Sequence, residues 1–171
     1  MKTAFEPYGL LLTAAVGAGA TTIEAGYEID KLALYLDFIN LMTYDLHGGG
    51  WENVTGIHTA LYARPEEDEN EATLNQVRVG IFVLSNDIGF FLLKNWAVNH
   101  WIQQGMPKEK ITMGVAAYGR TFKLADSSNT GIGAPSSDAG APGKYTKEAG
   151  FLSYYEVRSR TMTVPYFQYS F

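Results

Sequence analysis

The chain has 171 residues, 46% of them hydrophobic, and this length and composition predict a compact globular fold with a sizeable core. The formal net charge is -5 and the 13 Lys and Arg residues are scattered along the sequence, so we expect no nucleic acid partner. The chain lacks cysteine, which excludes disulfides and thiolate metal sites but does not indicate a compartment.

Strand-like and helix-like segments alternate through the first two thirds of the chain. The predicted strands are the apolar runs at residues 10–16, 35–45 and 111–119. One helix is predicted to start with Asp30 as its N-cap, and a second one to end at Gly105. Strands joined by helices favour an α/β fold with a parallel sheet covered on both faces, either doubly wound or closed into a barrel. Fewer than half the units of an eight-unit barrel fit in this length.

Beyond Thr121 the sequence becomes rich in Gly, Ser, Ala and Pro and loses any helical period. This composition predicts a loop or the start of an inserted subdomain. Two aromatic runs follow, at residues 151–157 and 163–171, and both read as strands that could pair antiparallel. The end of the chain therefore resembles a small α+β module.

A very apolar segment, residues 77–94, lies between an acidic loop and the second helix. A membrane-spanning helix needs about 20 apolar residues, and Asn86 and Asp87 interrupt this segment near its middle. We therefore expect no membrane partner. A β-hairpin with its turn at residues 85–89 is one interpretation of this segment.

The segment FINLMTYDLHGGGW, residues 38–51, changes from a buried-strand pattern to polar and glycine-rich sequence. Because side chains alternate along a strand, Met42 and Tyr44 should share one face while Thr43 lies on the other. In a parallel barrel, polar groups at the carboxyl end of a strand face the site. The polar end of this strand therefore predicts a site at Tyr44 and Asp45.

The run ITMGVAAYGR, residues 111–120, predicts the same arrangement on the next strand. Its even positions, which include Tyr118 and Arg120, share one face if the strand is regular throughout. Structural explanations also exist for these residues. Tyrosines such as Tyr118 suit half-buried core positions with a wet hydroxyl, and Asp45 suits a helix cap or a glycine-rich turn.

The remaining polar candidates carry weaker signals. His47, His58 and His100 lack metal-ligand spacing, so we expect no metal and no other cofactor. Trp51 could be a rim residue without a ligand. Asn53 begins the glycosylation sequon NVT, a short motif that arises often by chance and has meaning only in an exported chain.

Four stretches, in this order, closely resemble the second half of a glycoside hydrolase family 18 chitinase. They are LLLTAAV, YLDFINLMTYDLHGGGWENVTG, NWAVNHWIQQGMPKEKITMGVAAYGRTF and GAPGKYTKEAGFLSYYEV. MTYD and YGR are weak signals alone, but together with the intervening helix they are specific. The resemblance implies a partial (β/α)8 TIM barrel, about strands five to seven, over residues 1–122. Residues 123–171 would form part of the α+β insertion subdomain.

The resemblance also implies a chemistry, namely binding of chitin or chito-oligosaccharide. In a full-length family member it implies endo-hydrolysis of β-1,4-N-acetylglucosamine linkages with retention, in which the substrate's own N-acetyl oxygen attacks the anomeric carbon. Tyr44 matches a tyrosine that orients and polarises the acetamido group. Asp45 matches a sixth-strand aspartate that binds substrate, and both residues would support catalysis. The extracellular space is the location that the resemblance implies.

Five further residues match substrate-binding positions of the family. Met42 matches the methionine under the sugar at the cleavage site, and Trp51 resembles a tryptophan that stacks on a sugar ring. Tyr118 and Arg120 match groups that contact sugars on the leaving side. Glu148 matches a glutamate of the insertion subdomain that hydrogen-bonds substrate.

The sequence also departs from the family. The acidic catalytic motif D-x-x-D-x-D-x-E does not occur in the chain, so the general acid is missing and whether the chain is an enzyme stays open. Because such proton transfer contributes about 10²–10⁴-fold, we expect no hydrolysis by residues 1–171 alone. Between His47 and Trp51 this chain has one residue more than family members usually have. The alternatives are a chitinase-like lectin that binds without cleaving, or an inert gene fragment.

Two segments look foreign to the family. Residues 77–94 form an atypical apolar insert, which we interpret as translated intron, with a genuine hairpin as the alternative. At the beginning of the chain, Glu6 and Pro7 interrupt what would be the apolar core of a secretory leader, so no export signal is predicted in this chain.

Overall fold

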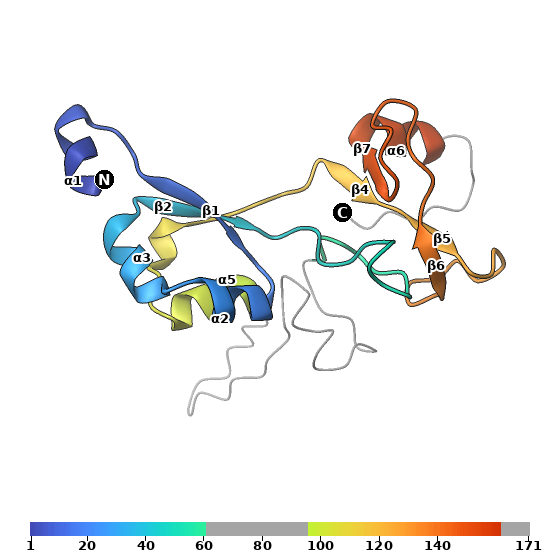
Figure 1. Ribbon diagram of the computed structural model, residues 1–171, viewed down its shortest axis with the longest axis horizontal. Helices are drawn as coiled ribbons and strands as arrows, with labels where there is room; N and C mark the ends of the chain where they lie inside the picture. The colour runs from blue at the N-terminus through green and yellow to red at the C-terminus, as the bar shows by residue number, and fades with distance from the viewer. Residues whose placement is uncertain (61–95, 162–171) are drawn as a thin grey trace, which may run out of the picture. The chain divides into compact units, whose positions relative to one another are not determined.

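The computed structural model describes residues 1–60 and 96–161 (Figure 1). Two compact units are present, and each is described by itself. Unit 1 comprises residues 1–46 and 59–115, and unit 2 comprises residues 47–58 and 116–171, in both cases without the undescribed positions. The apolar insert at residues 77–94 and the last aromatic run lie outside the described residues. The domain boundary after residue 122 stays a prediction.

Unit 1 contains a three-stranded parallel sheet in the order β1, β2, β3. The strands are β1 (Thr13–Gly17), β2 (Phe38–Met42) and β3 (Ile111–Met113). The register pairs Ala14 with Ile39, and Ile39 in turn with Ile111. The predicted parallel pairing of three successive strands is confirmed, and each strand is shorter than the apolar run that predicts it.

Short helices accompany this sheet. They are α1 (Lys2–Phe5), η1 (Glu6–Tyr8), α2 (Ala20–Gly26), α3 (Ile29–Tyr35), α5 (Trp96–Gln103) and η2 (Lys108–Lys110). The prediction that Asp30 is the N-cap of this helix is wrong, because α3 begins at Ile29 and Glu28 is the cap. Asp30 lies instead in the first turn, where its negative charge suits the helix dipole. Helix α5 ends at Gln103, and the glycine predicted to terminate it, Gly105, follows with a φ of 108°, as a glycine at a helix C-terminus commonly has.

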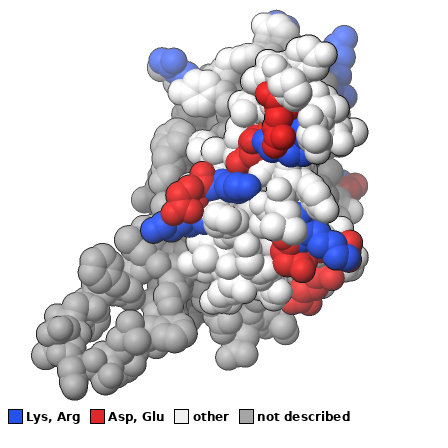
Figure 2. Space-filling model, turned by 90° about the vertical axis from the view of Figure 1, so that its left-hand side faces the viewer, with Lys and Arg blue, Asp and Glu red and all other residues white. Residues whose placement is uncertain are grey.

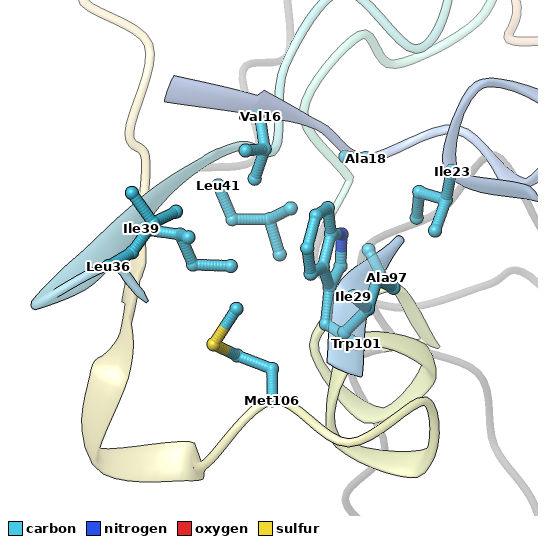
Figure 3. Packing of buried hydrophobic residues seen from close by; sticks show 10 residues of the cluster. All are labelled: Val16, Ala18, Ile23, Ile29, Leu36, Ile39, Leu41, Ala97, Trp101 and Met106. Atoms are coloured by element: carbon cyan, nitrogen blue, oxygen red, sulfur yellow. The ribbon is translucent and has the colours of Figure 1, made fainter. Parts of the chain in front are cut away.

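The core of unit 1 lies between the sheet and helices α2, α3 and α5 (Figure 3). The indole ring of Trp101 from α5 occupies its middle, fully buried, beside Leu41 of β2. Its Nε1 donates a hydrogen bond of 3.2 Å to the Gly17 carbonyl, and its ring centroid lies 5.0 Å from that of Tyr27. A polar atom on a large buried side chain is thereby satisfied, which lets the ring contribute its full apolar area.

The alternation predicted along β2 is confirmed. Ile39, Leu41 and Thr43 are fully buried, and the first two belong to the core. Asn40 is exposed and Met42 is half-buried, so both lie on the other face. That face carries the candidate Met42.

The prediction of one regular strand through residues 111–120 is wrong. Strand β3 ends at Met113, and β4 (Tyr118–Arg120) belongs to another sheet in unit 2. The backbone of residues 118–120 pairs antiparallel with β7 (Phe151–Ser153), so its hydrogen bonds are made outside the parallel sheet. The even positions of residues 111–120 therefore do not share one continuous face.

Unit 2 consists of two small antiparallel pairs and a helix. Strand β4 pairs with β7, and β5 (Phe122–Leu124) pairs with β6 (Ser136–Ala139). The predicted strand over residues 151–157 is partly wrong, because helix α6 (Tyr154–Thr161) begins directly after Ser153. The local sequence Ser-x-x-Glu is a capping signal for a helix start, and it prevails over the β preference of the two tyrosines.

Positive and negative side chains are interspersed on the face of the molecule that Figure 2 shows. Lys31 and Glu28 form one ion pair of the described residues. In the part of the chain that the structure describes, every helix is too short or too polar to cross a membrane.

Candidate functional site

The carboxyl end of β2 places three of the candidates, Met42, Tyr44 and Asp45, in unit 1. The half-buried ring of Tyr44 lies against the backbone of Gly114, because a Cβ added to that glycine would be 2.8 Å from Tyr44 Cε1. Asp45 is exposed and has a φ of 59°, a left-handed conformation that aspartate tolerates better than most residues. No helix begins in residues 46–60, so the alternative of Asp45 as a helix cap is wrong.

Three residues that are not among the sequence-predicted site residues, Thr43, Thr59 and Gly114, hold this end of the strand in place. Thr43 Oγ1 donates a hydrogen bond of 2.7 Å to the Gly114 carbonyl, and Gly114 N donates one of 2.8 Å to the Leu41 carbonyl. Thr59 Oγ1 donates to the Thr43 carbonyl at 3.0 Å. The backbone just before Tyr44 is therefore bound on both sides. The only signal for this role was an isolated glycine in a strand-like run, which often marks a close approach of two backbones.

Unit 2 brings Trp51, Tyr118 and Arg120 together around one guanidinium group. Arg120 Cζ lies 5.1 Å from the ring centroid of Trp51 and 5.6 Å from that of Tyr118. Phe151, which the sequence analysis missed, is the cross-strand partner of Arg120, and its ring centroid is 5.4 Å from the same Cζ. These distances are those of cation–π contacts. We call these four residues the Arg120 cluster.

The Arg120 cluster presents an aromatic face to solvent, because Trp51 is 55% exposed. The rings of Tyr118 and Phe151 contact each other, with centroids 4.8 Å apart, and so form a base under the guanidinium. The exposed indole can stack on the apolar face of a sugar ring. The planar guanidinium beside it has several donors and can hydrogen-bond the hydroxyls of the same sugar. This arrangement suits an uncharged polyhydroxy ligand.

The glycine-rich turn before Trp51 allows the indole its position. A Cβ added to Gly48 would lie 2.1 Å from Trp51 Cη2, so the ring rests on the backbone of that glycine. A Cβ on Gly49 would lie 2.5 Å from the Thr121 carbonyl oxygen, so this residue too must lack a side chain. The Glu52 carboxylate closes the turn, since it accepts a hydrogen bond of 2.8 Å from Gly48 N and contacts His47 Nδ1 at 3.0 Å.

Glu148, the remaining candidate, lies in unit 2 on the segment between β6 and β7. Its side chain is exposed, and it follows Lys147, which has a φ of 54°. A substrate-binding role for Glu148 stays a prediction. Among residues 1–60 and 96–161, no group of three or more His, Asp and Glu side chains is arranged to hold a metal ion.

A different glutamate, Glu156, organises the backbone near Glu148. It is only 4% exposed, and its carboxylate accepts hydrogen bonds from Tyr145 N at 2.7 Å and Thr146 N at 3.2 Å. It also accepts bonds from Ser153 N at 3.1 Å and Ser153 Oγ at 2.9 Å, so it joins the start of α6 to the preceding loop. Burial raises the pKa of Glu156, but these hydrogen bonds outweigh it and lower the pKa to about 2.

Replacing Glu156 by Gln is expected to lower the melting temperature by roughly 5 °C or more, because the amide cannot accept all four bonds. Thermal unfolding followed by circular dichroism measures this. The control is Glu148→Gln, an exposed glutamate in the same unit, which should melt like the parent. Equal melting of the Glu156→Gln variant and the parent would show that the carboxylate network is dispensable.

The same network predicts a pH dependence. Because the pKa of Glu156 falls from 4.5 to about 2 on folding, its contribution to stability is complete above about pH 4.5. The contribution is lost as the pH falls towards 2. Melting temperatures measured across this interval should therefore fall more steeply for the parent than for the Glu156→Gln variant. Parallel curves would contradict the assignment.

Comparison with known proteins identifies the class to which this fold and these residues belong. The family model "Glycosyl hydrolases family 18" matches residues 1–169, and the chain therefore belongs to this family. Chitotriosidase-1 of Mus musculus is 44% identical over 150 residues, which are 88% of this chain and 28% of that protein. The chain spans well under half the length of this relative.

Solved structures agree with this assignment. The group IV chitinase of Ostrinia furnacalis, in complex with allosamidin, superposes with a TM-score of 0.79 and 35% identity over 96% of this chain and 39% of that one. Human YKL-39, described as a pseudo-chitinase with retained chitooligosaccharide binding properties, has a TM-score of 0.79 and 36% identity. That match covers 94% of this chain and 41% of YKL-39.

These comparisons confirm the predicted family and the coarse fold. Family 18 chitinases are TIM barrels, so the three parallel strands of unit 1 are a piece of such a barrel. The assignment to strands five to seven and to the insertion subdomain stays a prediction.

Proposed function

We propose that this chain forms part of the sugar-binding cleft of a family 18 protein and binds chito-oligosaccharides. The observation that carries the proposal is the Arg120 cluster, in which the guanidinium of Arg120 contacts three aromatic rings and one of them, the indole of Trp51, is exposed. In this proposal Trp51 stacks on a sugar ring, while Tyr118 and Arg120 contact sugars on the leaving side. Chitooligosaccharide complexes of YKL-39 support this choice of ligand.

The proposal assigns the end of β2 to the cleavage site. Met42 lies under the sugar, Tyr44 orients and polarises its acetamido group, and Asp45 binds the substrate beside it. For Glu148 we propose a hydrogen bond to substrate. The pinned backbone before Tyr44 supports these roles, because catalytic and binding side chains require a rigid base.

In the whole protein we propose endo-hydrolysis of chitin with retention, in the extracellular space. The carboxylic acid that protonates the leaving group must then come from outside residues 1–171, because the acidic motif does not occur within them. The second candidate is a lectin that binds without cleaving, and the pseudo-chitinase YKL-39 favours it. A glutamate at the end of the acidic motif D-x-x-D-x-D-x-E in the full coding sequence distinguishes the enzyme from the lectin.

Calorimetric titration of the purified chain with tetra-N-acetylchitotetraose tests the binding proposal. We expect saturable binding of this ligand. Cellotetraose, which has hydroxyls in place of the acetamido groups, is the matched control and should bind more weakly. Equal binding of both sugars, or binding of neither, would refute the proposed function. A fluorogenic chitobioside should not be turned over by the same preparation.

A further inference from the structure

The sequon Asn53-Val54-Thr55 lies in the turn that follows the exposed indole of Trp51. It is the single Asn-x-Ser/Thr sequence in the 171 residues. Asn53 is exposed, so a group attached to its side chain would extend into solvent without disturbing the core. The position therefore meets the steric requirement for a glycan in the folded protein.

The backbone of the sequon is held while the Asn53 amide is not. Asn53 O accepts a hydrogen bond of 2.7 Å from Ser136 N. Thr55 Oγ1 donates to the Gly131 carbonyl at 2.8 Å and accepts from Ala134 N at 3.0 Å. Within the described ranges, no hydrogen bond occupies the side-chain amide of Asn53. The turn thus projects this amide from a rigid base.

Trp51 and Asn53 are separated by a single residue, Glu52, so their Cα atoms are at most about 7 Å apart. The first two sugars of an N-linked glycan are a β-1,4-linked pair of N-acetylglucosamines, which is also the repeating unit of chitin. A group tethered this closely has a high effective concentration at the neighbouring indole. The Trp51 ring is 55% exposed and available for stacking.

We infer that Asn53 is an N-glycosylation site and that the first sugars of its glycan stack on Trp51. In the attachment reaction, the Asn53 amide nitrogen attacks C1 of an oligosaccharide carried on a polyprenyl diphosphate. The new N–C1 bond replaces the C1–O bond to phosphate, the polyprenyl diphosphate leaves, and the amide nitrogen loses one proton. The inference rests on the proposed extracellular location, because the donor meets only exported chains. The attached glycan occupies the indole face that the proposed function assigns to substrate.

Expression of residues 1–171 behind a heterologous secretory leader in eukaryotic cells tests the attachment. The secreted chain should migrate more slowly in a gel than the same chain treated with peptide N-glycanase. The Asn53→Gln variant should lack this shift, while Thr55→Ser should retain it, because serine preserves both the sequon and the hydroxyl. A secreted parent chain without the shift would overturn the inference.

Acrylamide quenching of tryptophan fluorescence tests the stacking without any added oligosaccharide. The glycosylated chain should lose quenching relative to the enzyme-treated chain, because the glycan covers the indole of Trp51. The loss should disappear in a Trp51→Tyr variant that is still glycosylated, since Trp96 and Trp101 are less exposed. Identical quenching of the parent chain with and without its glycan would overturn the stacking. Because no ligand is added, this result is independent of whether the chain binds chito-oligosaccharide.

Discussion

The Trp101→Ala variant is expected to lose about 3–5 kcal/mol of folding free energy, the usual cost of removing a large buried aromatic side chain. Trp101 fills the middle of the unit 1 core, and its loss would also leave the Gly17 carbonyl without the indole donor. Because domains of this size are stable by only about 5–15 kcal/mol, this loss removes a large share of the folding free energy, and we expect unfolding at a clearly lower urea concentration. Urea unfolding followed by far-ultraviolet circular dichroism measures the change.

The matched control for this prediction is Ile102→Ala, one residue later in α5. Ile102 is 37% exposed, so its truncation removes less buried surface and should cost under about 1 kcal/mol. If the two variants unfold at the same urea concentration, the core is not organised around the indole of Trp101.

The second large effect concerns ligand affinity. Replacing Trp51 by Ala should weaken binding of tetra-N-acetylchitotetraose about tenfold or more, because it removes the exposed ring of the Arg120 cluster. The unglycosylated chain is used, and calorimetric titration measures the affinity. Tyr35→Ala is the control, since Tyr35 is an exposed aromatic residue at the end of α3 in unit 1. An unchanged affinity for the Trp51→Ala variant would remove Trp51 from the binding site.

Much of unit 1 could be predicted because its signals are local. The apolar runs predict the strands, and the helices between them predict that the strands are parallel. The alternation from Ile39 to Thr43 predicts which face of β2 is buried, since a strand has a period of two residues. The predicted cap of α3 was wrong by two residues, Asp30 in place of Glu28. Both acidic residues are acceptable near a helix start, and the backbone geometry decides which of them is the cap.

The candidate site was predictable only in part. Trp51, Tyr118 and Arg120 could be predicted as site residues from the family resemblance, but nothing in the sequence indicates that they meet at one guanidinium. Phe151 escaped notice because a phenylalanine in a strand-like run is most often a packing residue. It joins the cluster only because β7 pairs with β4 in a register that places it opposite Arg120.

Membership of family 18 follows from the sequence by itself, because ordered motifs along a chain need no knowledge of distant contacts. The burial pattern of β2 and the sequon at Asn53 are local properties in the same sense. Only the tertiary structure shows that the Glu156 carboxylate accepts hydrogen bonds from the backbone of both Tyr145 and Ser153. The same holds for Gly48, where the indole ring leaves no room for a side chain. The physical reason is that local preference constrains each backbone segment separately. Which segments then share hydrogen bonds and van der Waals contacts is decided by the packing of the whole chain.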